Sequence, residues 1–323
     1  MTQEYKKNVL KVSQALHRAK KVMVAAHINP DGDTLGCALA LGLALLHLGK
    51  KVTLICQDGM PSRFQFLPGS ELVVSDSRET ADVAVAMDCG SPTQLGTVSR
   101  AFFRAKQTIR VDHHDFGDAF GDIQVLDDEA SAVGEIVYDL IRSLKVEITP
   151  AIATCLLTSI IVDTGAFRFS NVRSKTFEIC ARLTKRGVDV QHLIEEAYWI
   201  KSRRMALLSS HAILNAEYSV DHGMAWSLIT QKDLKRYGAG LPDADSVADD
   251  LRSIEGVKLA AVFRETEKGN YRVSLRSKKN INVALVAKRF GGGGHHSSAG
   301  CTIRRASIQK KELLAALEEL IVR

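Results

Sequence analysis

The first half of the chain alternates short apolar runs with longer segments in which apolar residues recur every three or four positions. A short apolar run that ends at a polar turn predicts a buried strand, and the longer periodicity predicts a helix. The runs lie at 22–26, 52–56, 82–87 and 108–111, and helices are predicted after residue 35 and at 131–144, 150–162 and 174–186. This alternation predicts an α/β domain with a mainly parallel sheet and helices on both faces.

The pattern changes beyond residue 188. Residues 189–216 predict helix without any strand, and we expect them to link two domains. The remainder predicts a smaller α/β domain, with strands at 224–229, 258–263 and 271–275, a hairpin turn at 268–270, and helices at 282–290 and 308–322. The expected division is therefore a domain at 1–188, a helical linker at 189–216 and a second domain at 217–323.

Composition narrows the class of protein. A chain of 323 residues is long enough for two domains with their own cores, and 46% hydrophobic with 25% charged residues is typical of globular proteins. No apolar run has the length of a membrane span, and the N-terminus lacks the apolar core of a signal peptide. Six widely spaced cysteines include no C-x-x-C pair, which argues against a zinc ribbon or a disulfide framework. We expect a cytoplasmic protein with no membrane partner.

The net charge of +6 belongs to the second half of the chain. Residues 1–190 carry 22 basic and 22 acidic side chains, whereas residues 191–323 carry 21 and 15. The densest basic stretch is 264–289. A solvated basic face would explain it, and so would a surface that binds a phosphate-bearing substrate.

One turn concentrates candidate metal ligands. His27, Asp31 and Asp33 follow the first predicted strand, and in an α/β protein such turns lie at the carboxyl ends of strands, where ligands bind. One imidazole and two carboxylates suit Mn²⁺ or Mg²⁺ better than structural zinc. An ordinary helix start, with Asp33 as N-cap and Pro30 and Gly32 shaping the loop, would explain Asp33 but not its two neighbours.

Further acid and imidazole side chains stand where predicted elements end. Asp88 follows the third run, Asp112, His113 and His114 follow the fourth, and Asp163 ends a helix. Taken singly, each carboxylate could cap a helix or turn, and the histidines could make structural hydrogen bonds. Because charged groups next to buried strands are costly unless paired or metal-bound, their joint occurrence predicts a two-cation site with a bridging carboxylate.

A glycine-rich segment, residues 291–300, follows the basic stretch. Four glycines allow backbone N–H groups to approach an anion closely, although a flexible turn would also explain them. We expect a clamp for a terminal phosphate, and its candidate residues are Arg276, Gly293, Gly294, His295 and His296. Arg168 is a further candidate because it follows Asp163; the phenylalanines on either side of Arg168 could stack a base, but apolar core is the favoured interpretation.

These motifs, in this order, resemble those of a known superfamily. His27-x-x-Pro30-Asp31-x-Asp33, Asp88, Asp112-His113-His114 and Asp163 resemble the four motifs of the DHH phosphoesterases, and residues 291–300 resemble the glycine-rich loop of the DHHA1 domain. Within the superfamily the chain looks most like the stand-alone nanoRNase (NrnA-type) proteins. These combine oligoribonuclease activity with 3′-phosphoadenosine-5′-phosphate (pAp) phosphatase activity, and close relatives cleave cyclic dinucleotides.

The resemblance implies two Mn²⁺ ions, with Mg²⁺ or Co²⁺ as substitutes. The two implied ligand sets are His27, Asp31 and Asp88 for one ion, and Asp33, Asp88, His113 and Asp163 for the other. Two such cations, roughly 3.5–4 Å apart, acidify a water and clamp the phosphoryl oxygens. As further catalytic residues the resemblance implies His114, at the scissile phosphate, and Asp112, which orients the histidines. Ser298 stands where the family more often has alanine, which bears on fine substrate preference.

The activity implied is hydrolysis of very short single-stranded RNA to mononucleotides, with pAp dephosphorylation as a second activity. A cyclic- or linear-dinucleotide phosphodiesterase is the nearest alternative. A non-catalytic module that binds single-stranded nucleic acid is disfavoured because no expected ligand is missing from the sequence. A homodimer is an alternative to a single copy that the sequence leaves open.

Overall fold

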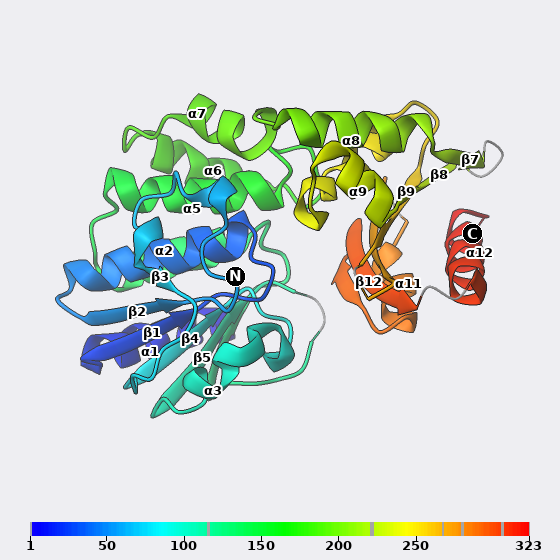
Figure 1. Ribbon diagram of the computed structural model, residues 1–323. Coiled ribbons are helices and arrows are strands. Elements are labelled where there is room, and N and C mark those ends of the chain that lie inside the picture. The colour runs from blue at the N-terminus through cyan, green and yellow to red at the C-terminus, as the bar shows by residue number, and fades with distance from the viewer. Residues whose placement is uncertain are drawn as a thin grey trace. The chain divides into compact units, whose positions relative to one another are not determined.

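The computed structural model describes residues 2–114, 117–219, 223–266, 268–278, 281–304 and 307–322, with the backbone alone at His295, Ser307 and Val322. The chain divides into two compact units, residues 1–200 and 201–323, each built around a six-stranded sheet (Figure 1). Among the described residues, no helix is both long enough and apolar enough to cross a membrane.

The sheet of the first unit is entirely parallel. Its strands are β1 (Lys21–Ala25), β2 (Lys51–Ile55), β3 (Val73–Val74), β4 (Val83–Met87), β5 (Gln107–Asp112) and β6 (Ile123–Leu126). They lie in the order β3-β2-β1-β4-β5-β6, so the direction of chain progression reverses between β1 and β4. In such sheets ligands bind outside the carboxyl ends of the strands at this reversal. The four predicted strands are present, and the edge strands β3 and β6 were not predicted.

Helices cover both faces of this sheet, as predicted. One face carries α1 (Gln3–Arg18), α2 (Gly32–His47) and α4 (Val133–Ser143). On the same side, α5 (Pro150–Asp163) packs on α2 and α4, and α6 (Ser174–Thr184) packs on α4 and α5. The other carries the 3₁₀ turns of η3 (Pro92–Val98) and α3 (Ser99–Phe102). The strands divide accordingly: Val22 and Val24 enter the larger core, and Met23 and Ala25 the smaller.

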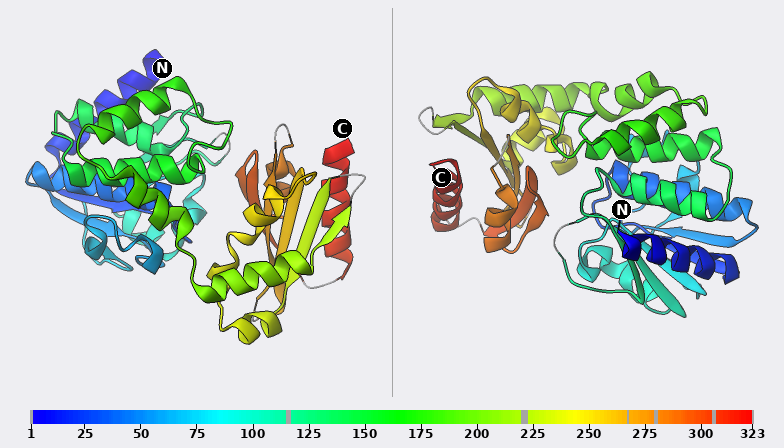
Figure 2. Two further views of the ribbon diagram at one scale, coloured as in Figure 1. Left: turned by 90° about the horizontal axis from the view of Figure 1, so that it is seen from above. Right: turned by 180° about the vertical axis from the view of Figure 1, so that it is seen from behind.

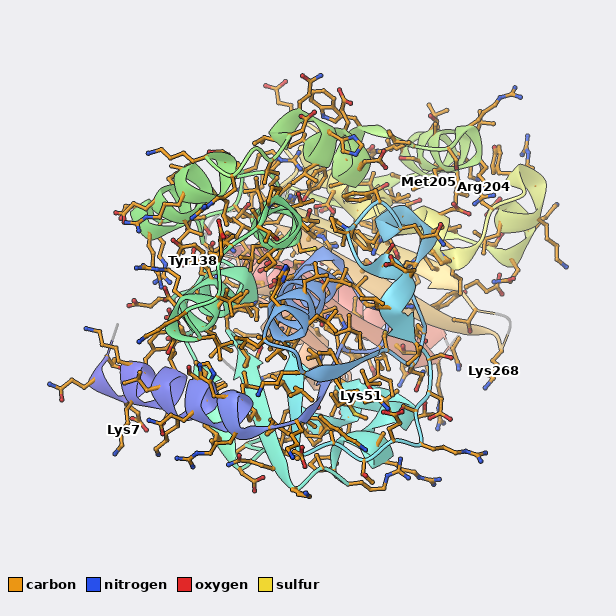
Figure 3. The ribbon with its side chains drawn as sticks, turned by 90° about the vertical axis from the view of Figure 1, so that its left-hand side faces the viewer. Lys7, Lys51, Tyr138, Arg204, Met205 and Lys268 are labelled. Carbon is orange, nitrogen blue, oxygen red and sulfur yellow. The ribbon has the colours of Figure 1, made fainter. Side chains whose placement is uncertain are left out.

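Helix α1 shows how sequence pattern becomes packing. Tyr5, Val9 and Leu16 are buried on one side of it, whereas Lys7 is exposed and projects away from the unit (Figure 3). The helix lies beside β6 (Figure 2). The Asn8 side chain donates to the backbone carbonyl of Gln124 in β6 at 3.0 Å.

Small residues allow α2, α4 and α5 to approach one another closely. A Cβ at Gly36 of α2 would lie 2.5 Å from the carbonyl oxygen of Cys155 in α5. A Cβ at Gly134 of α4 would lie 2.2 Å from the hydroxyl of Ser159. The close packing brings the start of α2 and the end of α5, both of which carry candidate ligands, to the same edge of the sheet.

The predicted helical linker is helical but interrupted. It contains α7 (Val190–Ile194) and the π-helical turn η4 (Glu195–Trp199) in the first unit, and α8 (Arg203–Leu214) in the second. The first unit extends to residue 200, and the Tyr198 hydroxyl donates to the carbonyls of Ile161 and Val162 at the end of α5. Ser202 caps α8 by accepting from the Met205 backbone N–H.

The second unit is a mixed sheet in the order β11-β12-β10-β9-β8-β7. Its strands are β7 (Glu217–Ser219), β8 (Met224–Ile229), β9 (Leu259–Glu265), β10 (Asn270–Ser277), β11 (Gly293–His295) and β12 (Ser298–Arg304), and its other helical elements are α9 (Gln231–Tyr237), η5 (Leu241–Ala244), α10 (Val247–Ser253), α11 (Val283–Arg289) and α12 (Ser307–Val322). The predicted β9–β10 hairpin is present, while β8 and β9 pair in parallel through α9 and α10, two short helices that were not predicted.

Candidate metal centre

All the metal ligands implied by the sequence come together at the carboxyl edge of the first sheet. The strand-end residues are His27 after β1, Asp88 after β4, and Asp112, His113 and His114 at the end of β5. The helical residues are Asp31 and Asp33 at the start of α2 and Asp163 at the end of α5. The site therefore lies at the chain reversal between β1 and β4, where the topology predicts a ligand.

The first group comprises His27, Asp31 and Asp88, whose candidate ligand atoms all lie within 4.8 Å of one another. His27 Nε2 is 3.8 Å from Asp31 Oδ1 and 3.4 Å from Asp88 Oδ2. Asp31, and not Asp33, is the N-cap of α2, because its Oδ1 accepts from the backbone N–H groups of Asp33 and Thr34 at 3.0 Å each. The alternative that made Asp33 an ordinary helix cap is therefore wrong.

The second group comprises Asp33, His113 and Asp163. His113 Nε2 is 3.4 Å from Asp163 Oδ2 and 3.8 Å from Asp33 Oδ2. Asp33 is fully buried, and its Oδ1 accepts from the Ser159 hydroxyl at 2.6 Å while its Oδ2 accepts from the Val133 backbone N–H at 2.9 Å. A buried carboxylate held by neutral donors beside a second carboxylate is suited to a cation.

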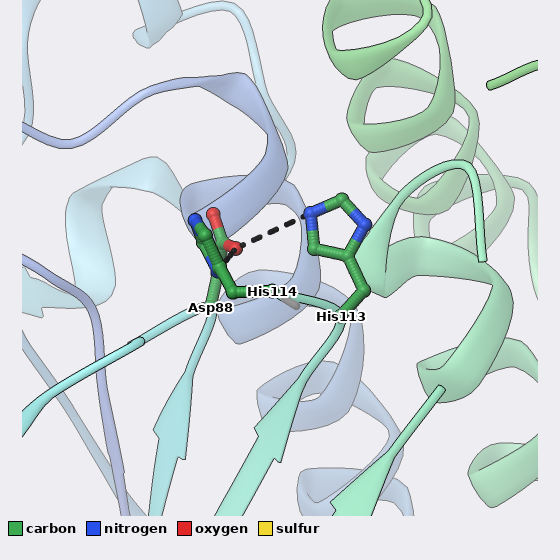
Figure 4. Close-up of side chains that lie close together, drawn as sticks. All are labelled: Asp88, His113 and His114. Atoms are coloured by element: carbon green, nitrogen blue, oxygen red, sulfur yellow. Dashed lines mark ion pairs between the residues drawn. The ribbon is translucent and has the colours of Figure 1, made fainter. Parts of the chain in front are cut away.

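Asp88 belongs to the first group and also faces the second, because it forms a third candidate group with His113 and His114. Its Oδ2 faces His27, and its Oδ1 lies 3.7 Å from His113 Nε2 and 3.5 Å from His114 Nδ1 (Figure 4). Its backbone has a left-handed φ of 56°, and Oδ1 is buried yet accepts no hydrogen bond from the described residues. A strained backbone and a buried carboxylate oxygen without a donor are both costly. The donor set fits divalent cations that prefer oxygen and imidazole ligands.

Backbone carbonyls fix the orientation of two histidine rings. The Nδ1 of His27 lies 2.8 Å from the carbonyl of Ile28, and the Nδ1 of His113 lies 2.9 Å from the carbonyl of Ala130. Because a carbonyl only accepts, each Nδ1 carries a proton. Each Nε2 is thereby directed at the carboxylates, as in metal-binding histidines whose other nitrogen donates to the protein.

The charged groups of the centre shift one another's pKa values. Burial works to lower the pKa of both His27 and His113, but the surrounding carboxylates outweigh it and raise each pKa to about 10. Burial, reinforced by the charge of Asp88, raises the pKa of Asp33 to about 7. Protons therefore occupy positions that a divalent cation would replace at neutral pH.

His114 and Asp112 form a separate pair. Asp112 Oδ1 accepts from His114 Nδ1 at 2.7 Å, and its Oδ2 accepts from the guanidinium of the buried Arg110. Burial acts to raise the pKa of Asp112, but the bonds from His114 and Arg110 hold it below its ordinary value. Asp112 is thus an ionised residue that orients His114.

Sequence reasoning missed the residues that support these ligands. Ser159 lies four positions before Asp163 in α5, so helical spacing places both on one side of the helix and could have indicated it. Arg110 lies two positions before Asp112 on β5, the spacing of side chains on one face of a strand. The carbonyl of Ala130 has no signal in the sequence.

Two family models match the chain: the DHH family, N-terminal domain, over residues 21–160, and the DHHA1 domain, over residues 235–323. A relative from Thermus thermophilus, named "Bifunctional oligoribonuclease and PAP phosphatase NrnA", is 32% identical over 308 residues, which cover 94% of this chain and 90% of that protein. The chain belongs to the DHH family.

A second relative and a solved structure are also similar to this DHH protein. The cyclic-di-AMP phosphodiesterase GdpP of Geobacillus thermodenitrificans is 26% identical, and the match covers 93% of this chain but 47% of that protein. The crystal structure of an exopolyphosphatase-related protein from Bacteroides fragilis matches with a TM-score of 0.89 at 23% identity, covering 97% of this chain and 96% of that one. This last likeness shows a shared fold, and the predicted resemblance to DHH and DHHA1 proteins is confirmed.

The candidate substrate residues of the DHH protein's second unit lie in adjacent strands. The register pairs Ser298 of β12 with Arg276 of β10 on one side and with His295 of β11 on the other. Gly293 and Gly294 are exposed on β11, and the His296 side chain is exposed. The side chain of His295 lies outside the described part of the structure. Arg276 is partly exposed, and its Nε donates to Asp249 Oδ2 at 3.2 Å.

Arg168 lies in the loop after Asp163. Its Nε donates to the carbonyl of Gly165 at 2.5 Å, and its guanidinium lies over the ring of Tyr198 at 5.2 Å. Phe167 is partly buried against the larger core, as favoured from the sequence, and stacks on the exposed ring of Phe177.

Proposed function

We propose that this DHH protein is a metal-dependent phosphoesterase that hydrolyses very short oligoribonucleotides to mononucleotides and removes the 3′-phosphate of pAp to give AMP. The observation that carries the proposal is Asp88, which presents one carboxylate oxygen to each of two histidine–carboxylate groups. The name of the Thermus thermophilus relative, which matches 94% of this chain, supports the choice of substrates.

The proposed centre binds two Mn²⁺ ions, for which Mg²⁺ or Co²⁺ can substitute. The ligands of one ion are His27, Asp31 and Asp88, and those of the other are Asp33, Asp88, His113 and Asp163. The groups His27–Asp31–Asp88 and Asp33–His113–Asp163 support this division. The assignment of Asp88 to the second ion as well is supported by the 3.7 Å between its Oδ1 and His113 Nε2. Carboxylate-rich sets with imidazole suit Mn²⁺, and geometry and availability, more than affinity, decide the ion bound.

The side chains then divide the work of an in-line displacement at phosphorus. Bound cations would supply acidification of the attacking water and neutralisation of the phosphoryl oxygens. Burial acts to lower the pKa of His114, but the hydrogen bond to Asp112 and the nearby carboxylates outweigh it, and the pKa is raised. A larger fraction of the imidazole is therefore protonated at neutral pH. We assign to His114 a hydrogen bond to the scissile phosphate or its leaving oxygen, held in place by Asp112. No covalent enzyme intermediate is needed.

We assign the selection of short substrates to the second unit. Arg276, His295 and His296, with the backbone of Gly293 and Gly294, are proposed to bind the terminal phosphate of a short substrate, and Arg168 a phosphate near Asp163. The strand register, which aligns Arg276, Ser298 and His295 in one row, supports a common anion site. A clamp for the terminal phosphate would favour short substrates over long polymers.

Turnover of a defined substrate series tests the proposal. With Mn²⁺ present, we compare pApA, a 5-mer and a 24-mer RNA, pAp and cyclic di-AMP. We expect rapid hydrolysis of pApA, the 5-mer and pAp, and slow hydrolysis of the 24-mer. Fastest degradation of the 24-mer would contradict the preference for short substrates, and absence of all hydrolysis would contradict the proposed activity.

A cyclic- or linear-dinucleotide phosphodiesterase is the second candidate. The match to GdpP favours it, but the chain spans about half the length of that protein. Cleavage of cyclic di-AMP faster than of pApA or the 5-mer would identify this second activity. A non-catalytic nucleic-acid-binding module is not supported, because every expected metal ligand is present and lies in the centre.

We also propose the cytoplasm as the compartment of this protein. All six cysteines are free and buried, as expected where thiols are kept reduced.

A further inference from the structure

Residues 130–133, which are the end of the loop after β6 and the first residue of α4, contact ligands of the second group. The carbonyl of Ala130 accepts from His113 Nδ1 at 2.9 Å. The backbone N–H of Val133 donates to Asp33 Oδ2 at 2.9 Å. The segment therefore fixes the ring of one candidate ligand and the carboxylate of another.

Asn171 ties the third ligand of this group to the same segment. Its side-chain amide Nδ2 donates to the carbonyl of Ser131 at 2.8 Å and to the carbonyl of Asp163 at 3.1 Å. One amide nitrogen thus links the backbone that carries Asp163 to the backbone that orients His113. The side chain of Asn171 is exposed, so its packing contributes little to the core.

A buried polar network holds the segment in place. The fully buried carboxylate of Glu135 accepts from the hydroxyls of Ser131 and Thr176 at 2.7 Å each. Arg173 donates to Glu135 at 2.8 Å and to Asp127 at 3.1 Å, and so bonds both ends of the 127–135 stretch. A buried carboxylate with satisfied partners is costly to rearrange, which makes the segment rigid.

This network contacts the second group of candidate ligands and not His27 or Asp31 of the first, among the described residues. Among the described residues, no hydrogen bond or ion pair joins residues 130–133, Asn171, Arg173 or Thr176 to His27 or Asp31. The first group is instead ordered by the carbonyl of Ile28 and by the start of α2. The two groups share the start of α2 and Asp88, but the bonds from residues 130–133 and Asn171 reach the ligands of the second group alone among the described residues.

We propose that Asn171, with the Glu135–Arg173–Thr176 network behind it, is a positioning residue that sets the affinity of only one of the two metal sites, that of Asp33, His113 and Asp163. The inference rests on the proposed metal centre. Partners that orient metal ligands contribute about 10- to 100-fold to metal affinity, and here that contribution falls on one site.

Calorimetric titration of the metal-free protein with Mn²⁺ tests it. We expect two binding events in the unchanged protein. In Asn171→Ala and Asn171→Asp, one event weakens about 10- to 100-fold while the other is unchanged. Thr176→Val, which removes the hydroxyl but keeps the size, weakens the same event. Hydrolysis of pApA by these variants falls at low Mn²⁺, returns with excess Mn²⁺, and retains its KM for pApA.

Lys175→Ala is the matched control. It breaks an ion pair of 2.9 Å with Asp139 that joins the same helices, α6 and α4, and Lys175 is not a member of the Glu135–Arg173–Thr176 network. We expect both binding events to be unchanged in this variant. Thermal unfolding of each metal-free variant shows that it is folded.

Three outcomes separate the inference from the proposed function. Selective weakening of one event supports the inference. Equal weakening of both events, or of neither, in the folded Asn171 variants overturns the inference and leaves the proposed function intact. Failure of the unchanged protein to bind Mn²⁺ and to hydrolyse pApA overturns the proposed function itself.

Discussion

Two aspartates that each end a parallel strand have different surroundings. Asp112 is paired with Arg110 and His114, so its charge is compensated within the protein. Asp88 has a buried oxygen that accepts no hydrogen bond from the described residues, so its charge is available to a cation. The sequence predicted both aspartates at the site. The difference in their surroundings depends on Arg110, whose position on β5 was not used in the prediction.

Asp112→Asn tests the role of the pair in catalysis. The amide keeps the shape but removes the charge that raises the pKa of His114. We expect kcat for pApA to fall about 10- to 100-fold with Mn²⁺ binding retained. Because His114 would lose its proton at lower pH, the alkaline limb of the kcat–pH profile should move to lower pH. An unchanged profile would show that Asp112 does not act through His114.

Protons and metal ions should compete for the centre. In the metal-free protein the pKa values of His27 and His113 are about 10, and that of Asp33 is about 7. These groups must lose protons on binding a cation, so Mn²⁺ affinity should rise with pH through this range. Titrations in buffers of different ionisation enthalpy measure the protons released. Binding without proton release would contradict these pKa values.

Among the elements, those with strong periodicity were predicted and the weak ones were not. Strands β1, β2, β4 and β5 are buried central or near-central strands with apolar runs. The edge strands β3 and β11 have two and three residues, and β11 is glycine-rich, so neither has an apolar pattern to detect. The short helices α9 and α10 were not predicted, although α11, which is also seven residues long, was.

The contact of α2 with α5 should control both stability and metal binding. Gly36→Ala would place a Cβ 2.5 Å from the Cys155 carbonyl oxygen, and the helices that carry Asp33 and Asp163 would have to separate. We expect a loss of about 1–3 kcal/mol in the free energy of unfolding, measured with urea, and weaker Mn²⁺ binding. Gly240→Ala, with space for a Cβ, is the control. Unchanged stability in Gly36→Ala would contradict close packing here.

At the scale of the whole chain, the sequence predicted two α/β parts joined by helical residues. The first compact unit continues to residue 200 because Tyr198 bonds to the end of α5, a contact between distant positions that no local pattern shows. The motifs that carry the chemistry were predictable because most of them stand at strand ends, and the family resemblance implied their division into two groups. The bonds that hold the ligands, from Ser159, Val133 and Ala130, needed the fold.

Arg276 tests the part assigned to the second unit. Arg276→Ala should raise the KM for a 5′-phosphorylated 3-mer about tenfold, the effect of losing a charge-assisted hydrogen bond of about 1.4 kcal/mol, with kcat little changed. Arg252→Ala is matched, because Arg252 also pairs with Asp249, at 3.0 Å, yet is not assigned to substrate. An equal rise in KM in both variants would indicate a structural effect of the Asp249 pairs instead of phosphate binding.

Asp88→Asn tests whether Asp88 joins the two proposed metal groups into one hydrolytic centre. The amide retains the size of the side chain but cannot bridge two cations as a carboxylate does. We predict loss of at least one Mn²⁺ in calorimetric titration and a fall of about a thousandfold in hydrolysis of pApA, corresponding to about 4 kcal/mol. Asp76→Asn, at an exposed position, should match the unchanged protein. Undiminished hydrolysis with two Mn²⁺ bound in Asp88→Asn would contradict the account.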